Sequence, residues 1–126
     1  MGGVGLGEGM QAEILKRRTK EYALAILRIA ARLPSDQASN ILAGQLMRAG
    51  TSVGANYRAS CRARSRADFI AKLKIVEEEC DESLYWLELL IASGQVQETA
   101  CAELMFEGSQ ILSMIVASIK TARSSQ

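Results

Sequence analysis

The stretch ADFIAKLKIVEEECDESLYWLELLIASG, residues 67–94, decides the fold class of this chain of 126 residues. Its apolar side chains recur at steps of three and four, which places them on one face of a helix; they are Phe69, Leu73, Val76, Cys80, Leu84, Leu87 and Ile91. Ser65 can cap the start of this helix, and Gly94 can end it. The stretch therefore predicts one long amphipathic helix.

The same helical spacing continues on both sides of this stretch. Ahead of it, one segment runs to Leu33-Pro34, and a second follows a cap at Ser35 or Asp36. Behind it, a further segment begins at about Val96. The apolar stripes of these three segments are Leu15, Tyr22, Ile26, Ile29 and Leu33; Leu42, Leu46, Ala49, Val53, Asn56 and Ser60; and Cys101, Leu104, Gly108, Ile111, Ile115 and Ile119. Short connections between four long helices predict an all-α, antiparallel, up-down-up-down four-helix bundle.

Length and composition indicate one domain. We expect a flexible glycine-rich tail at residues 1–9, a single bundle domain at residues 10–122 and a second flexible tail at residues 123–126. The three cysteines are widely spaced, which is typical of reduced thiols. No apolar run reaches the roughly 20 residues of a membrane span, and the start lacks the pattern of a secretion signal. The sequence favours a cytoplasmic protein that does not enter a membrane.

An enzyme site is the first functional hypothesis to test. The acidic run EEECDE, residues 77–82, puts Glu77 with Asp81 and Glu78 with Glu82 on helix faces. Di-metal bundles pair such acids with histidine, however, and this chain has none. A cysteine without a histidine also lacks the usual activating base. The sequence therefore predicts no catalytic residue, metal, cofactor or small-molecule substrate, and the acids read as a solvated or partner-facing surface.

Charge is segregated along the chain although its formal net charge is only +1. Residues 1–66 hold eleven Lys and Arg against four Asp and Glu, a net of +7, whereas residues 67–126 hold four against ten, a net of −6. Such asymmetry suits either a basic face for phosphates or complementary faces that pair within the fold or between copies. It favours a homo-oligomer.

Two basic clusters are candidates for contact with the backbone of RNA or other nucleic acid. They are Lys16, Arg17, Arg18 and Lys20 near the start of the first helix, and Arg58, Arg62 and Arg66 at one-turn spacing further on. The alternative is an ordinary charged face, with these arginines paired to acids of the third helix. Tyr57 is a ring on which a base could stack, but six aromatics in all give no repeated stacking platform. Any binding should therefore be to the backbone and weakly sequence-specific.

Two further features concern packing. Asn56, with Ser52 one turn before it, falls on the predicted inner face of the second helix, where an amide needs hydrogen-bond partners. We expect the pair to tie helices together, with ligand binding as the alternative. Of Tyr85 and Trp86, one should point away from the core, which favours an oligomer interface over packing on a neighbouring helix.

The run QLMRAGTSVGANYRASCRARSRADFIAKLKIVEEECDESLYWLELL, residues 45–90, resembles bacterial four-helix bundle proteins related to those encoded in 23S rRNA intervening sequences. The residues that carry the resemblance are Arg48-Ala49, Ser52-Val53, Asn56, Arg64-Ser65 before Asp68-Phe69, and Glu82-Ser83. Relatives have an acidic residue and a glycine where this chain has Ala59 and Ser60. The resemblance implies a left-handed bundle and a homopentameric ring, without a settled activity.

The leading hypothesis is a non-enzymatic homo-oligomer whose surface on the first and second helices binds nucleic-acid backbone. The alternative is a structural or protein-protein interaction module that binds no nucleic acid.

Overall fold

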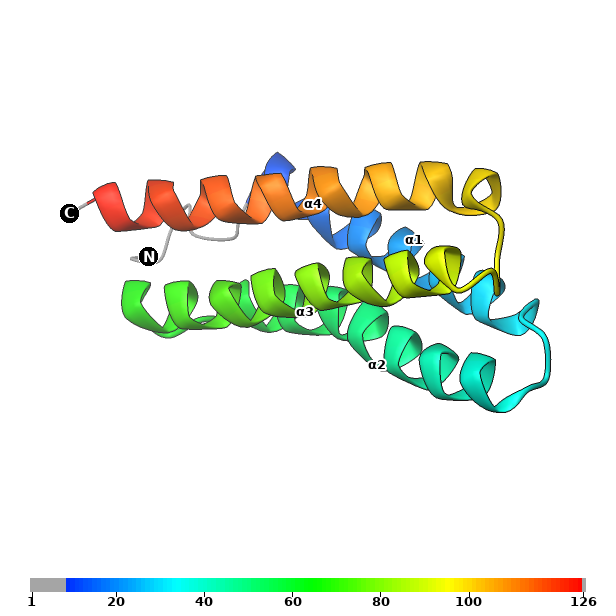
Figure 1. Cartoon of the computed structure of the whole chain (residues 1–126). Helices are drawn as coiled ribbons and strands as arrows, with labels where there is room; N and C mark the ends of the chain where they lie inside the picture. Colours follow the sequence, from blue (N-terminus) through cyan, green and yellow to red (C-terminus); the bar gives the residue numbers. More distant parts are fainter. Residues whose placement is uncertain (1–8, 126) are drawn as a thin grey trace.

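The computed structural model describes residues 9–125, which form four α-helices (Figure 1). They are α1 (Met10–Ala31), α2 (Gln37–Ser60), α3 (Arg66–Ala92) and α4 (Glu98–Ser124). Residues 9–125 contain no strand, so the predicted all-α fold is confirmed. The tail predicted at residues 1–9 lies outside the described residues except for Gly9, and α4 continues past the predicted domain end at residue 122.

The helix ends follow from local chemistry. Asp36 accepts a hydrogen bond from the Ser39 backbone N–H (2.8 Å) and starts α2, and the Ser65 hydroxyl accepts one from the Asp68 N–H (3.0 Å) at the start of α3. Gly94 adopts φ of +81°, a left-handed conformation that glycine enters at little cost, just after α3 ends. The predicted caps and stop are thus confirmed, while α4 begins at Glu98 rather than near Val96.

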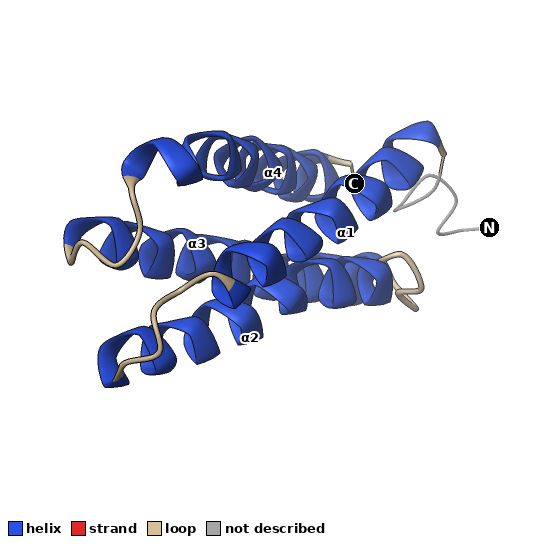
Figure 2. Ribbon diagram, turned by 90° about the vertical axis from the view of Figure 1, so that its right-hand side faces the viewer, coloured by secondary structure: helices blue, strands red, loops and turns tan. Residues whose placement is uncertain are grey.

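Successive helices run in opposite directions. Gly50 of α2 packs against Ile26 of α1, while Gly54, one turn later, packs against Thr19, which is earlier in α1. Figures 1 and 2 show the same alternation through the whole bundle. Each helix contacts its two neighbours, but α1 and α4 touch over a shorter stretch than the other pairs do. The bundle is therefore antiparallel, with its loosest seam between α1 and α4.

The core is made of the predicted stripes with small shifts in register. In α3 the first six positions of its stripe are buried as expected, whereas Leu90 is fully buried in place of the half-buried Ile91. Cys80 and Cys101 are buried thiols, and burial raises the pKa of Cys80 to about 12. At the centre, the Tyr22 hydroxyl lies 2.8 Å from Ser83 Oγ. Since Ser83 itself donates to the Cys80 carbonyl (2.7 Å), Tyr22 is the donor in this bond.

One helix is apolar enough to raise a question about membranes. Among the described helices, α4 alone has the length and composition that could cross a bilayer, a test that the core helix of a soluble protein also passes. Its residues Cys101, Ile111, Ile115 and Ile119 are buried in the bundle. Only 28% of the apolar window of α4 is buried in this way, so core packing accounts for one face of the helix and not for its whole apolar character.

Candidate nucleic-acid interface

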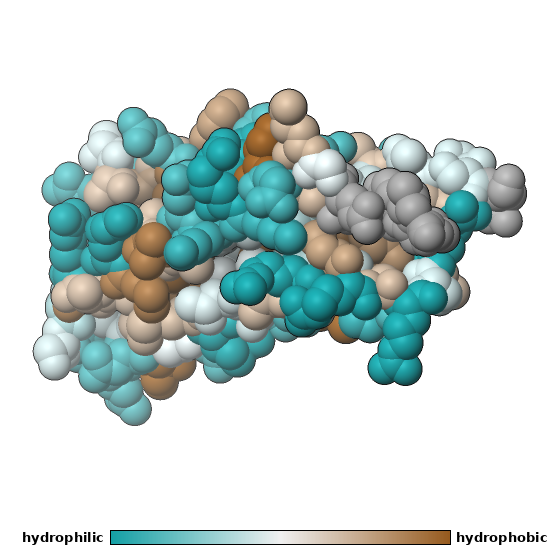
Figure 3. Space-filling model, turned by 180° about the vertical axis from the view of Figure 1, so that it is seen from behind, coloured by the Kyte–Doolittle hydropathy of each residue, from teal (hydrophilic) through white to brown (hydrophobic). Residues whose placement is uncertain are grey.

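A hollow of about 620 Å³ lies between α1 and α2. Its charged lining includes Lys16, Arg17 and Lys20 from α1 and Arg58 from α2, with Glu13 the one acid. The structure thus brings residues of both predicted basic clusters to one place, which we call the basic groove. In the view from behind, hydrophilic side chains run across the middle of the molecule, and apolar side chains are seen toward the left end and at the upper edge (Figure 3).

Small residues of α2 give the groove its floor, namely Thr51, Gly54 and Ala55. A Cβ added at Gly54 would lie 3.1 Å from Thr19 Oγ1, a tight contact, so the glycine lets the two helices approach closely. Thr19 is buried and donates to the Leu15 carbonyl (2.7 Å). The lean composition of α2 therefore serves close packing against α1. This part of the lining was not predicted from the sequence, although Gly50 and Gly54 at four-residue spacing indicate that α2 closely approaches another helix.

The cations of the groove are largely free to meet a ligand. Within residues 9–125, Arg17, Lys20 and Arg58 are exposed and have no hydrogen-bond or ion-pair partner. Lys16 has a weak contact with Glu13, at 3.5 Å between Nζ and Oε2. Exposed pairs at this distance contribute little, so they do not neutralise the site.

The fold also sorts charge along the bundle axis. The end that holds residues 10–20, 50–77 and 111–125 carries twelve Lys and Arg against three Asp and Glu, a net of +9. The opposite end, residues 21–49 and 78–110, carries three against ten, a net of −7. We call these the basic half and the acidic half; the basic half is the end at which α4 finishes in Figure 1. The basic groove lies almost wholly in the basic half.

Arg18 does not belong to the groove, which corrects its predicted role. Its guanidinium forms two hydrogen bonds of 2.8 Å with the Glu107 carboxylate on α4. This pairing raises the pKa of Arg18, and the side chain lies on the opposite side of α1 from the groove. Arg18 precedes the buried Tyr22 by one helical turn, so the spacing in the sequence already indicated that Arg18 lies on the side of α1 that faces the bundle.

The arginine stripe predicted after Arg58 is interrupted. Since α2 ends at Ser60, Arg62 lies in the following turn, exposed and close behind Arg58 in the chain. Arg66 is the first residue of α3 and half-buried, and its Nε is buried without a hydrogen-bond partner. Neither lines the basic groove, and within residues 9–125 neither has an ion-pair partner, but only Arg62 is exposed.

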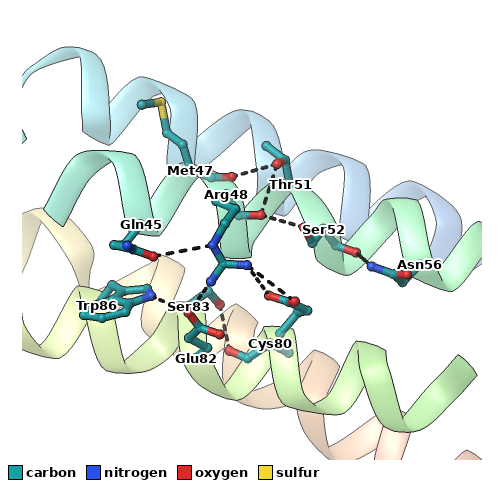
Figure 4. A network of polar contacts seen from close by, with 11 residues as sticks. Gln45, Met47, Arg48, Thr51, Ser52, Asn56, Cys80, Glu82, Ser83 and Trp86 are labelled. Atoms are coloured by element: carbon teal, nitrogen blue, oxygen red, sulfur yellow. Dashed lines mark hydrogen bonds and ion pairs between the residues drawn. The ribbon is translucent and has the colours of Figure 1, made fainter. Parts of the chain in front are cut away.

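The alternative of intramolecular pairing holds for Arg48, which precedes the predicted stripe on α2. Figure 4 shows its guanidinium directed from α2 toward α3, where it pairs with Glu82 and, at 3.1 Å, with Glu79. These contacts raise the pKa of Arg48. Trp86 joins the network by donating its indole N–H to Glu82 (3.1 Å). Arg48 therefore helps to join α2 to α3 and is not available to phosphate.

Ser52 and Asn56 differ from expectation. Both are half-buried, while Val53 and Tyr57 beside them are buried. Ser52 Oγ donates to the Arg48 carbonyl (2.7 Å) and Asn56 Nδ2 to the Ser52 carbonyl (2.9 Å), so both bonds stay within α2 (Figure 4). Short polar side chains in helices commonly satisfy themselves on the preceding turn. The pair thus lies at the edge of the core and forms no hydrogen bond to another helix.

The aromatic side chains are placed away from the groove. Tyr57 is only 3% exposed, which corrects the suggestion that it stacks a base. Tyr85 is 52% exposed and Phe106 66%, and both lie in the acidic half. Of the Tyr85-Trp86 pair, Tyr85 is the one that points outward, as predicted.

Comparisons with known proteins place this geometry in context. A family model described as "23S rRNA-intervening sequence protein" matches residues 12–117. A crystal structure of a protein of unknown function from the S23 ribosomal protein family of Bacteroides thetaiotaomicron is similar, with a TM-score of 0.82 and 34% sequence identity. The match covers 88% of this chain and 99% of that one. No curated protein matches.

Proposed function

The chain belongs to the family of 23S rRNA-intervening sequence proteins, and from that premise we propose that it is a non-enzymatic protein that binds RNA backbone in the basic groove. The observation that carries the proposal is the meeting of Lys16, Arg17, Lys20 and Arg58 on one groove. Three of these cations have no partner within residues 9–125 and Lys16 has only a weak contact with Glu13, so the cluster suits a row of phosphates.

Two further points support the proposal. The groove lies in the half of the bundle with net charge +9, so the surrounding field attracts polyanions toward it. The family description also names an intervening sequence of 23S rRNA, and the description of the structural neighbour names a ribosomal protein family. Charge and position therefore support a phosphate-rich ligand, and the family description supports the choice of RNA for the proposal.

The proposal predicts strongly salt-dependent binding. Fluorescence anisotropy with a labelled RNA should show affinity falling by roughly 10²-fold between about 50 and 200 mM salt, because four or five phosphate contacts release their counterions. Unrelated RNA sequences should bind with similar affinity. Absence of binding at the lowest salt, or an affinity that salt does not change, would contradict an interface built on phosphates.

A second proposal concerns assembly. Large apolar side chains are exposed on all four helices, namely Leu24, Leu27, Ile41, Ile75, Tyr85 and Phe106. Such surface favours contact with other copies. We propose a cytoplasmic homo-oligomer, with five subunits the number expected from the family resemblance.

Light scattering at micromolar protein and physiological salt should give a mass several times that of the 13.7 kDa chain. A monomer under these conditions would contradict the assembly. An oligomer that binds no RNA would instead leave the chain as a protein-protein interaction module.

A further inference from the structure

We infer that the nucleic acid held in the basic groove is a double helix, gripped by its phosphates, rather than a single strand held by its bases. This inference rests on the proposed function and deepens it. It follows from where the fold puts its aromatic rings relative to its free cations.

The basic half offers no ring on which a base can stack. Among residues 9–125 its aromatics are Tyr57 and Phe69, which are 3% and 5% exposed. The exposed rings of Tyr85 and Phe106 lie in the acidic half, where the net charge of −7 repels phosphate. Proteins that hold single strands gain much of their affinity by stacking bases on aromatic side chains beside a basic track. In this molecule the exposed aromatic rings and the basic groove lie in opposite halves of the bundle.

The lining of the groove also lacks the amide side chains that make paired contacts to adenine. It contains no Asn or Gln, and its uncharged members are Thr19, Ala23, Thr51, Gly54 and Ala55. Lys and Arg side chains can reach phosphates of any sequence, whereas amide side chains are needed for paired contacts to adenine. The charged lining therefore suits backbone contact with any sequence, and its base contacts are limited to those that Lys, Arg and Thr can make.

The backbone positions of the cations are fixed on two packed helices, which favours a ligand whose phosphates are regularly spaced. Lys16 and Lys20 are one turn apart on α1, a rise of about 6 Å, and Arg58 faces them from the antiparallel α2. A single strand must be ordered before its phosphates match such fixed positions, which costs conformational entropy. A double helix presents its phosphates already ordered. Without stacking to offset the ordering cost, the single strand should bind more weakly.

Competition binding can decide the matter at about 100 mM salt. The probes are an RNA duplex of about 16 base pairs, the span of a small duplex-binding domain, an unstructured single strand of the same length, and a DNA duplex of the same sequence. We expect the RNA duplex to bind at least about 10-fold more tightly than the single strand. Comparison of the affinities for the two duplexes shows whether the groove prefers an RNA or a DNA double helix.

Equal or tighter binding of the single strand would overturn the inference while leaving phosphate binding intact. The variant Tyr85→Ala with Phe106→Ala gives an independent check once light scattering shows that it keeps the oligomeric state of wild type, because its duplex affinity should then stay within about 2-fold of wild type. Loss of single-strand binding in that variant would place a stacking site in the acidic half and contradict the inference. Absence of binding to every probe would overturn the proposed function itself, and the inference with it.

Discussion

Replacing Gly108 by valine should lower the free energy of unfolding by about 3 kcal/mol. Gly108 is buried in α4, and a Cβ there would lie 2.7 Å from Leu84 Cδ2 and 2.8 Å from the Tyr22 hydroxyl. The ring of Tyr22 is 1% exposed and its hydroxyl is bonded to Ser83, so it has no room to withdraw. Gains in helix propensity of at most about 1 kcal/mol cannot offset this overpacking.

Urea unfolding followed by circular dichroism, at one fixed protein concentration, measures this effect. The matched control is Gly44→Val in α2, where a Cβ meets nothing within 4 Å. That variant should be as stable as wild type or slightly more stable, because valine is a better helix former than glycine. Wild-type stability for Gly108→Val would show that the centre of the bundle yields to a larger side chain.

The double variant Arg58→Glu with Arg62→Glu should weaken RNA binding by roughly 100-fold at about 100 mM salt. Both arginines are exposed and have no partner within residues 9–125. Their replacement removes up to two phosphate contacts and adds repulsion beside Lys16 and Lys20. The slope of log affinity against log salt should become shallower by about 2. Anisotropy across a salt series measures both quantities.

The chain supplies a closely matched control in Arg28→Glu with Arg32→Glu. These residues lie in the last turn of α1 and at its C-cap, much as Arg58 and Arg62 lie at and just after the end of α2. They are exposed and belong to the acidic half, so the same change in net charge occurs far from the groove. We expect an affinity within about 3-fold of wild type. An equal loss in both variants would show that net charge, not the groove, governs binding.

Light scattering on the same samples distinguishes a loss of RNA contacts from a loss of the oligomer. If Arg58→Glu with Arg62→Glu dissociated the oligomer and wild type bound no RNA, these arginines would belong to the subunit interface.

The buried face of a helix was predicted well where bulky apolar residues are separated by charged ones. The stripe of α3 is an example, since bulky residues such as Phe69 and Leu73 alternate with lysines and glutamates. In α2 the contrast is weak, because glycine, alanine and serine occupy 11 of its 24 positions. The predicted stripe therefore included Asn56, whereas the structure buries the adjacent Tyr57. A shift of one residue rotates a helical position by about 100° and changes its role.

The groove could be predicted only in part for a similar reason. Lys16, Arg17, Arg18 and Lys20 form one cluster in sequence, but successive residues of a helix point in different directions. Arg18 consequently meets Glu107 on α4, while its neighbours line the hollow against α2. Arg58 faces Lys16 and Lys20 because α1 and α2 pair in antiparallel directions. The spacing of residues within one helix does not predict which helices pair or at what register.

The axial separation of charge makes this nearly neutral molecule a large electric dipole. A net charge of +1 suggests weak attraction to any polyanion. In the field of a nucleic acid, however, ends of +9 and −7 experience opposite forces, and the resulting torque turns the bundle before contact. Collisions that begin with the wrong end forward are redirected rather than lost. If the basic groove binds RNA as proposed, orientation as well as attraction raises the fraction of encounters in which the groove arrives first.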